Sequence, residues 1–419
     1  MRENKSLEYK LDTTKTFLKT VSAFANYGTG TILFGVDDDG NTVGIKNPKH
    51  ECLKIENMIN DSVNPVPNYS LSVNEKTHVI SLKVNEGRYK PYLCNSVAYR
   101  RNDTATIPVD RMELERLVRE GQNIRYEELP CADNKLTFKV LEGKLQKELN
   151  ISEISEDVLK TFELYSEDSG YNNAAELLAD TNKCNGIDAV RFGQTISIIL
   201  DRETFNHRSI LLQYDQMVNM YRKYYQYEEI AGSTREKKEL IPEEAFREAI
   251  ANALVHRMWD IDADINVSMF EDRIEITSPG GLPRDISLEE YLEGGLSIPR
   301  NPIISYVFLR LNLIERFGTG IRRIREAYVN SQSKPIYKVT ENMIRITLPI
   351  VADSGNLNED ERKILDLLGK YGNMRMSSSK IAELTNMGKT KVVSLMNKLV
   401  DEGYVRKTGR GRGIGYTKN

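Results

Sequence analysis

Three acidic side chains and a lysine near the start of the sequence could together act on a phosphodiester. Glu3, Glu8 and Lys10 come before a helical pattern, and Asp38 follows an apolar run of strand length. Converging carboxylates are hard oxygen ligands for Mg²⁺ or Mn²⁺, and the bound ion stabilises charge on a phosphate while a lysine neutralises a neighbouring oxygen. Glu8 and Lys10 share one face if residues 5 to 10 form a strand, whereas Glu3 joins them only if the chain bends. Otherwise Glu3 is a terminal acid and Asp38 part of a solvated turn.

Three polar residues later in the chain recur at helical spacing. Glu248, Asn252 and His256 are four residues apart, so a helix places them on one face, while the apolar residues between them supply the packed face. A polar stripe of this kind on a packed helix predicts a functional face.

Glycines follow this helix at two places. Gly280 and Gly281 come after a predicted hairpin, and Gly318 and Gly320 come directly before a predicted helix. Backbone N–H groups at a helix N-terminus attract anions. We therefore expect the second place to offer a phosphate site.

Positive charge is concentrated at the C-terminal end. The whole chain has a formal net charge of −3, but residues 389 to 419 hold eight Lys or Arg residues and two acids, a local charge of +6. Three short helical patterns and a glycine-rich basic hairpin predict a winged helix-turn-helix that binds DNA by neutralising phosphates. The alternative is a winged helix used for protein contacts or dimerisation. The side chains expected at the DNA are Lys389, Thr390, Lys391, Ser394, Arg406, Lys407, Arg410 and Arg412.

Apolar spacing in the first 120 or so residues predicts the elements that position the acidic residues. The strand that begins at residue 31 is expected to be a covered central strand, and an Asp-Gly turn is expected to lead from it into a return strand. A strand and loop over residues 96 to 107 would place Arg100 or Arg101 against phosphates. The expected elements are helices over residues 13 to 26, 50 to 63 and 110 to 120, and strands over residues 31 to 36, 42 to 45, 70 to 73 and 78 to 84.

The region from residue 125 to 240 carries no chemistry that its sequence identifies. Its last helix is rich in tyrosine, which predicts core packing, although stacking on bases would use the same side chains. The expected elements are helices over residues 153 to 165, 174 to 178 and 210 to 225, and strands within residues 188 to 200.

Length and composition predict a soluble protein of several domains. A chain of 419 residues suggests roughly three domains, and 40% hydrophobic with 28% charged residues is an ordinary soluble composition. No apolar run approaches the roughly 18 residues of a membrane span. Four scattered cysteines without paired spacing favour reduced thiols in the cytoplasm and argue against structural zinc.

The acidic stretch also carries a resemblance to a known family. The pattern Glu3-x4-Glu8-x-Lys10, with the Ala-Phe-Ala-Asn and Gly-Val-Asp-Asp segments that follow, is similar to the Schlafen-type AlbA nucleic-acid-binding domain over about the first 120 residues. The resemblance implies RNA or DNA as a partner. Because some members of this family cleave RNA, it also implies an acidic centre on Glu3, Glu8 and Asp38, with Lys10 beside them.

The polar helix resembles the N-box helix of GHKL ATPases, and residues 240 to 350 are similar to the divergent GHKL-like domain of proteins related to RecG helicases. The resemblance implies ATP as ligand, with Asn252 holding its Mg²⁺ and Glu248 orienting an attacking water. No helicase P-loop pattern is present. Ser278 and Pro279 stand where the family has an adenine-reading aspartate, so the resemblance favours nucleotide binding over adenine selectivity or hydrolysis.

Together these patterns predict an α+β multidomain chain that forms a homo-oligomer. We interpret it as a nucleotide-responsive transcriptional regulator. A Schlafen-type metal-dependent nuclease acting on RNA is the alternative, and a scaffold with degenerate sites is the third reading. The expected segments are an AlbA-type α/β domain over residues 1 to 122, a connecting region over 123 to 240, a GHKL-like α/β sandwich over 241 to 351 and a winged helix over 358 to 419.

Overall fold

A computed structural model describes most of the chain. It covers residues 2–231, 234–283, 286–295, 298–315, 318–351, 359–371, 374–401, 404–409 and 414–418. The predicted DNA contacts Arg410 and Arg412 lie outside these ranges. No helix within them is long and apolar enough to cross a membrane.

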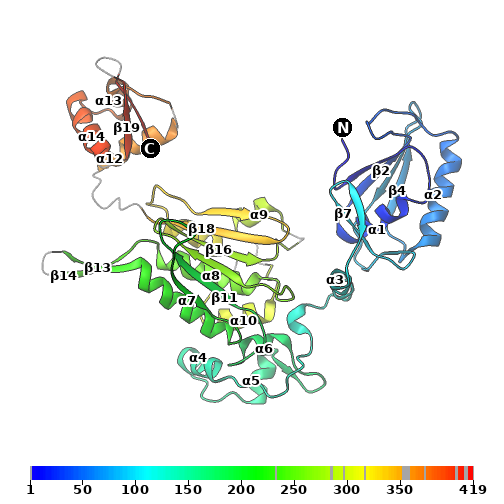
Figure 1. The fold of residues 1–419 in the computed structure, drawn as a ribbon, viewed down its shortest axis with the longest axis horizontal. Helices are drawn as coiled ribbons and strands as arrows, with labels where there is room; N and C mark the ends of the chain where they lie inside the picture. The colour runs from blue at the N-terminus through cyan, green and yellow to red at the C-terminus, as the bar shows by residue number, and fades with distance from the viewer. Residues whose placement is uncertain are drawn as a thin grey trace.

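The N-terminal domain is built on a four-stranded sheet with the order β1-β2-β5-β4 (Figure 1). β1 runs parallel to β2, and the other neighbours are antiparallel. Two helices, α1 (Phe17–Tyr27) and α2 (Pro48–Ser62), bury their apolar faces in the core that the sheet shares. This order confirms β2 as a central strand. The sheet consists of β1 (Leu7–Lys10), β2 (Gly30–Phe34), β4 (Tyr69–Val73) and β5 (Ile80–Val84).

The return strand predicted over residues 42 to 45 is not formed. The only pairing after the Asp-Gly turn is an isolated bridge between Val36 and Thr42. Both edges of β2 are already hydrogen-bonded, to β1 and to β5, so no edge is left for a third partner. The chain instead crosses the end of β2, where Gly35 packs against the backbone of Gly44.

Short strands and a last helix complete this domain. The two hairpin strands β7 and β8 pair with each other and carry Arg100 and Arg101. The predicted helices over residues 50 to 63 and 110 to 120 correspond to α2 and α3. The remaining elements are β3 (Val63–Asn64), β6 (Leu93–Cys94), β7 (Tyr99–Asn102), β8 (Ala105–Pro108) and α3 (Arg111–Gln122).

The middle of the chain forms a six-stranded sheet with the order β12-β11-β15-β16-β18-β17. All neighbours pair antiparallel except β11 and β15, which are parallel. The strands are β11 (Ile187–Phe192), β12 (Ile199–Thr204), β15 (Ile265–Met269), β16 (Arg273–Pro279), β17 (Ile336–Val339) and β18 (Met343–Pro349).

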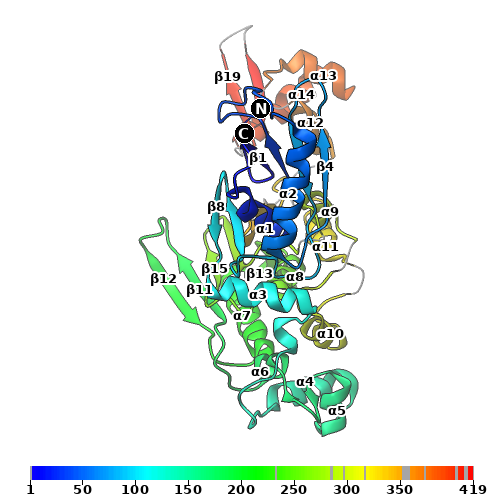
Figure 2. The same cartoon turned by 90° about the vertical axis from the view of Figure 1, so that its right-hand side faces the viewer.

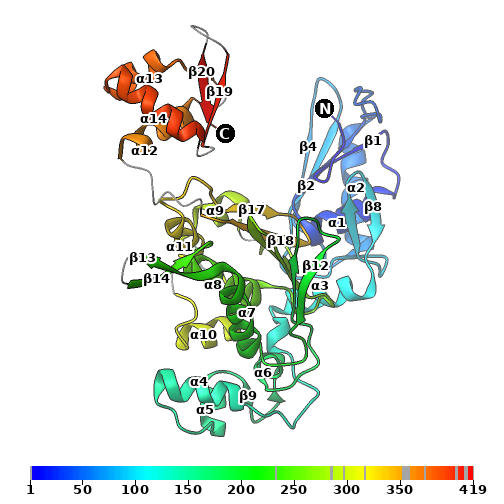
Figure 3. The same ribbon diagram turned by 60° about the vertical axis from the view of Figure 1, so that its left-hand side comes forward.

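Helices of this middle unit pack around α8, which contacts α7, α10 and α11 as well as β16 and β18. Figure 3 shows α7 and α8 side by side. A hairpin of β13 (Gln226–Ala231) and β14 (Thr234–Glu239) connects them. The helices are α4 (Lys139–Leu149), α5 (Glu156–Thr161), α6 (Asn173–Leu178), α7 (Ile210–Tyr225), α8 (Glu243–His256), α9 (Leu288–Glu293), α10 (Pro302–Arg310) and α11 (Gly320–Ala327).

The domain boundary expected at residue 240 falls inside this packed unit. Strands β11 and β12 belong to the same sheet as β15 to β18, and one hydrophobic core runs from Phe138 to Leu348. Helix α7 joins that core through buried residues such as Met217 and Tyr221. Residues 187 to 225 are therefore part of the middle unit, because their buried apolar side chains belong to the same core.

The C-terminal unit has its own small core of three helices and a two-stranded antiparallel sheet (Figure 2). Three helices are present in the described part of this unit, as the three short helical patterns predict. Asn386, in the left-handed conformation, ends the second helix, and the third begins three residues later. The elements are α12 (Glu359–Lys370), α13 (Ser378–Thr385), α14 (Lys389–Asp401), β19 (Val405–Thr408) and β20 (Gly415–Lys418).

Helix α3 connects the N-terminal domain to the middle unit. Arg116 Nε and Arg119 Nη2 lie 2.8 and 2.6 Å from Asp260 Oδ2, which follows α8 in the chain. Burial acts to raise the pKa of Asp260, but hydrogen bonds from the two guanidinium groups outweigh it and hold that pKa below its ordinary value. Asp260 is therefore charged in the folded protein.

A buried acid, Glu127, caps the helix α10. It lies in the 3₁₀ turn η1 (Tyr126–Glu128), and its two carboxylate oxygens accept hydrogen bonds from the backbone N–H groups of Ile303 and Ile304 at 2.8 and 3.0 Å. Burial raises the pKa of Glu127 to about 7, although these two hydrogen bonds act in the opposite direction.

We predict that Glu127 makes the middle unit less stable as the pH rises from about 4.5 to about 7. In this window the folded state binds the proton more tightly than the unfolded state, so stability falls with rising pH, by about 3 kcal/mol at most. Urea unfolding followed by fluorescence of Trp259, the single tryptophan, measures it. Glu127→Gln should remove this fall, and Glu128→Gln, at a partly buried neighbour, should retain most of it. An equal pH dependence in both variants would contradict the assignment.

Candidate functional site

Glu8 forms the centre of a buried polar cluster in the N-terminal domain. Its side chain, on β1, is ion-paired with Arg101 and lies 2.6 Å from Lys10 Nζ, and it accepts a hydrogen bond from Thr20 Oγ1 at 3.2 Å. Glu8 is only 5% exposed. The structure thus places Glu8 and Lys10 on one face of a strand, as their spacing predicts.

The other two acids do not join this cluster. Glu3 Oε1 accepts a hydrogen bond from the backbone N–H of Tyr9 at 2.7 Å, and Asp38 is exposed in the turn after β2. In the part of the chain that is described, no three His, Cys, Asp or Glu side chains are grouped so that they could hold a metal ion. The expectation that Glu3, Glu8 and Asp38 converge on a metal is therefore corrected: Glu8 is neutralised by cations instead.

The two arginines of β7 point to different environments. The Arg101 side chain is buried, with its guanidinium group bonded to Glu8, to Thr106 Oγ1 at 3.0 Å and to the carbonyl of Asn4 at 3.2 Å. Arg100 is partly exposed and lies 3.3 Å from Glu113. Arg101 is thus a structural partner of Glu8 and not a phosphate contact, and Arg100 is the arginine that can reach a ligand.

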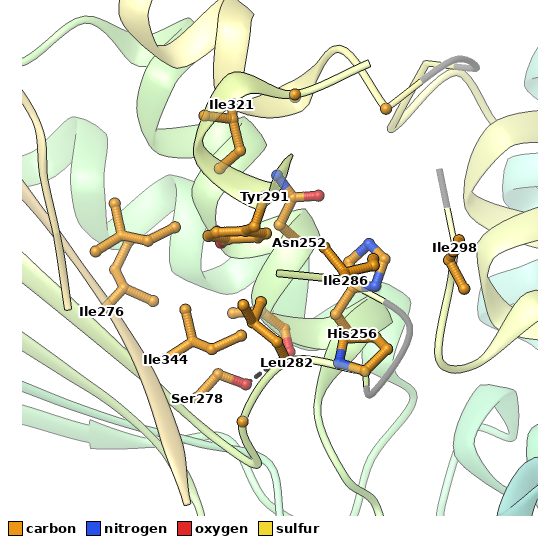
Figure 4. Close-up of a pocket in the computed structure, with 17 residues that line it drawn as sticks. Asn252, His256, Ile276, Ser278, Leu282, Ile286, Tyr291, Ile298, Ile321 and Ile344 are labelled. Atoms are coloured by element: carbon orange, nitrogen blue, oxygen red, sulfur yellow. Dashed lines mark hydrogen bonds between the residues drawn. The ribbon is translucent and has the colours of Figure 1, made fainter. Parts of the chain in front are cut away.

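A pocket lies beside α8 in the middle unit (Figure 4). Asn252 and His256 from the predicted polar stripe line it, whereas Glu248 lies behind them and accepts a hydrogen bond from Asn252 Nδ2 at 3.1 Å. Burial lowers the pKa of His256 to about 4, and the charge of Arg300 acts in the same direction. His256 is therefore neutral near pH 7 and offers one N–H donor and one nitrogen acceptor.

The floor of the pocket is apolar. Ile276, Ile344 and Ile346 come from the adjacent strands β16 and β18, and Ile286 and Tyr291 close it from the segment around α9. Alternation along β16 and β18 could have identified the three strand residues. Tyr291 had no such signal, because its contribution depends on where the loop before α9 runs.

Three of the four predicted glycines line the pocket, namely Gly281, Gly318 and Gly320. A Cβ atom on Gly320 would lie 2.3 Å from Glu248 Oε1 and 2.8 Å from Asn252 Nδ2, so the start of α11 rests directly on this pair. Gly280 is outside the lining. It has φ +98° and packs against Met258, which makes it a turn residue.

Arg300 fixes the geometry of the pocket wall. Its Nε donates to the carbonyl of His256 at 3.1 Å and its Nη2 to the carbonyl of Gly281 at 2.7 Å. The hydroxyl of Ser278, inside the pocket, donates to the carbonyl of Ala253 at 3.1 Å. Ser278 thus has no donor left for a ligand.

The C-terminal unit presents a basic face. Lys389, Thr390, Lys391 and Ser394 are exposed on α14, and Lys391 Nζ lies 2.5 Å from Asp360 Oδ2. Arg406 and Lys407 are exposed on β19. All six described members of the predicted DNA contact set are therefore accessible to solvent.

Comparison with known families identifies two domains. The model of the Schlafen AlbA_2 family matches residues 3–110. A HATPase-type model, described as "Putative ATP-dependent DNA helicase recG C-terminal", matches residues 262–348. The chain thus contains an N-terminal Schlafen AlbA_2 domain followed by a HATPase-like domain, which supports a function related to nucleic acid.

Other comparisons add little. No curated protein matches the chain. Among solved structures, the DIP2311 protein from Corynebacterium diphtheriae has 17% identity, with 99% of this chain and 92% of that chain covered, and a TM-score of 0.49. A likeness at this level carries no argument about function.

We predict that the two adjacent arginines of β7 differ sharply in their effect on stability. Arg101→Ala leaves the buried Glu8 carboxylate without its main partner and should cost about 3 kcal/mol. Arg100→Ala removes a partly exposed pair and should cost about 1 kcal/mol or less. Hydrogen exchange of the β2 amides in the full chain measures both. Equal losses would show that Glu8 does not depend on Arg101.

Proposed function

We propose that the chain is a nucleotide-responsive transcriptional regulator, which binds ATP in the pocket beside α8 and DNA on its C-terminal unit. The observation that carries this proposal is the pocket, where the polar stripe of α8 and the glycine start of α11 meet across an apolar floor. Apolar walls with a few placed polar groups are typical of small-molecule sites.

The residues of the pocket fit a nucleotide. A base can pack on Ile276, Ile344 and Tyr291, and backbone N–H groups at Gly318 and Gly320, where α11 begins, can bind phosphates. The amide oxygen of Asn252 is the hard ligand that would hold Mg²⁺, which offsets the charge of the phosphates when bound.

Weak base selectivity is expected from the same lining. Ser278 is committed to the carbonyl of Ala253, and no carboxylate lines the pocket among the described residues. An adenine amino group thus has no acceptor of that kind. Burial raises the pKa of Glu248, so its carboxylate holds a proton more tightly than an exposed glutamate does. Because Ser278 stands where the family has an aspartate, we propose nucleotide binding without rapid hydrolysis.

The C-terminal unit supports DNA binding as a winged helix. Helices α13 and α14 form the helix-turn-helix, and β19 and β20 the wing. In this geometry α14 enters the major groove and the wing contacts the backbone, which uses the exposed basic residues of both. The AlbA_2 domain would bind RNA or DNA separately, through half-buried Lys10 and partly exposed Arg100.

We predict that the full chain binds ATP and GTP with magnesium, with affinities within a few fold of each other. Asn252→Ala should abolish this binding, because it removes the amide that faces the phosphates and leaves Glu248 without its donor. Asn266→Ala, an exposed asparagine on β15, is the matched control and should bind normally. Calorimetry measures each case. Absence of heat with both nucleotides for the unmutated chain would remove nucleotide binding from the proposal.

DNA binding should depend on salt through the basic face. Replacing Lys389, Lys391, Arg406 and Lys407 by alanine should flatten the slope of log K against log salt by about 3.6 units, at roughly 0.9 per phosphate contact. Lys370→Ala with Lys380→Ala, which lie in α12 and α13, should leave the slope unchanged. Fluorescence anisotropy with a labelled duplex gives the slopes. If the four substitutions do not alter the slope, this face does not contact DNA.

A nuclease of the Schlafen type is the second candidate, because the Schlafen AlbA_2 family model matches residues 3–110, which include Glu8 and Lys10. The chain is incubated with tRNA, single-stranded DNA and duplex DNA in Mg²⁺ or Mn²⁺, beside Glu8→Gln and Asp38→Asn variants. If the chain is a regulator, nucleic acid is bound and remains intact. Divalent-dependent cleavage that both substitutions abolish would replace the regulator by the nuclease.

A further inference from the structure

A second cavity lies where α3 of the N-terminal domain meets the middle unit, at the junction visible in Figure 1. We call it the junction cleft. One side is lined by Arg116 and Arg119 of α3, and the other by Trp259, Asp260 and Arg300. The turn from Gly281 to Pro283 lines both this cleft and the nucleotide pocket, so one thin wall separates the two cavities.

Positive charge in the junction cleft exceeds negative charge. Arg116 and Arg119 both bind the single carboxylate of Asp260, and Arg300 makes no ion pair with any described residue. Burial lowers the pKa of Arg300, with Asp260 acting against this and the like charge of Arg116 adding to it, so the three guanidinium groups are electrostatic neighbours. Three cations thus share one anion.

The other charged groups of the cleft compensate for only part of this excess. Each is paired, but Lys90, the partner of Glu120, is shared with Glu86. These pairs are Glu113 with Arg100, Glu120 with Lys90, Arg125 with Glu128, and Glu341 with Lys5. A local excess of one positive charge therefore remains for a ligand to neutralise.

Trp259 supplies an independent observation. It is 7% exposed and lines the cleft, and its indole Nε1 is buried without a hydrogen-bond partner among the described residues. One ring face is covered by the guanidinium group of Arg257, whose centre lies 4.2 Å from the ring centroid. A buried N–H group without an acceptor is costly, so Trp259 brings an unsatisfied donor to the wall of the cleft.

We propose that the junction cleft is a second binding site, which takes a phosphate group between Arg116, Arg119 and Arg300, with the indole N–H of Trp259 as a further donor. Phosphate fits better than carboxylate, because its tetrahedrally arranged oxygens can accept from several guanidinium forks at once. The phosphate belongs either to a free nucleotide or to a nucleic-acid backbone. This site is additional to the nucleotide pocket and to the basic face of the C-terminal unit.

Trp259 is the only tryptophan of the chain, so its fluorescence reports this site directly. The full chain is titrated with inorganic phosphate, with AMP and with a short single-stranded oligonucleotide lacking terminal phosphates. We expect a saturable change in emission. A stronger response to AMP assigns the site to a free nucleotide, and a stronger response to the oligonucleotide assigns it to a backbone. No change with any of the three overturns the proposal.

Variants separate this site from the nucleotide pocket. Arg116→Gln with Arg119→Gln should weaken the response roughly ten- to hundredfold, since each loses a charge-assisted hydrogen bond. Arg116→Lys with Arg119→Lys keeps the charge and should restore part of the affinity, which a purely structural role of the two arginines would not predict. Asn252→Ala should leave the response intact even though it abolishes binding in the pocket. Equal affinity in the Gln and unmutated chains, or a response lost in Asn252→Ala, overturns the proposal.

Trp259→Phe removes the N–H donor while retaining an aromatic ring. Calorimetry with the ligand that gave the stronger response replaces fluorescence for this variant. A several-fold loss of affinity is expected, and an unchanged affinity would exclude the indole from the site.

Discussion

The packing of α8 against the six-stranded sheet is the constraint on which the rest of the middle unit depends. One side of this helix is fully buried, with Phe246, Ile250 and Leu254 in the core. That burial leaves Asn252 and His256 facing the pocket, and it fixes where the chain emerges after the helix. Arg257 then folds back onto the carbonyls of Ile261 and Ala263, and Asp260 reaches the arginines of α3. The packing of α8 thus positions both the pocket beside the helix and the domain junction formed by the residues that follow it.

Periodicity was sufficient to predict the helices whose apolar faces are local. The polar stripe of α8, the span of α7 and the three helices of the C-terminal unit follow from it. It could not predict that β11 and β12 join strands more than sixty residues later, because pairing partners at that distance leave no local pattern. The prediction of a return strand after β2 was wrong for a related reason. The sequence shows the Asp-Gly turn, but it does not show that both edges of β2 are already paired.

The acidic residues of the N-terminal domain illustrate a different limit. Their types and spacing suit metal binding, yet a carboxylate can equally be neutralised by cations from a distant strand. Glu8 is held by Lys10, two residues away, and by Arg101, which arrives from β7. Two adjacent arginines on a strand point to opposite faces, so the sequence could indicate that only one is accessible but not which. In the structure, Arg100 is the accessible one.

Nucleotide response is the central claim, and the affinity of the full chain for nucleic acid with and without saturating ATP and Mg²⁺ tests it most directly. Because linkage is reciprocal, a nucleotide that alters DNA or RNA affinity must have its own affinity altered by the same factor. We predict a change of several fold or more in the unmutated chain and none in Asn252→Ala. Identical affinities in the presence and absence of bound nucleotide would contradict a nucleotide-responsive regulator.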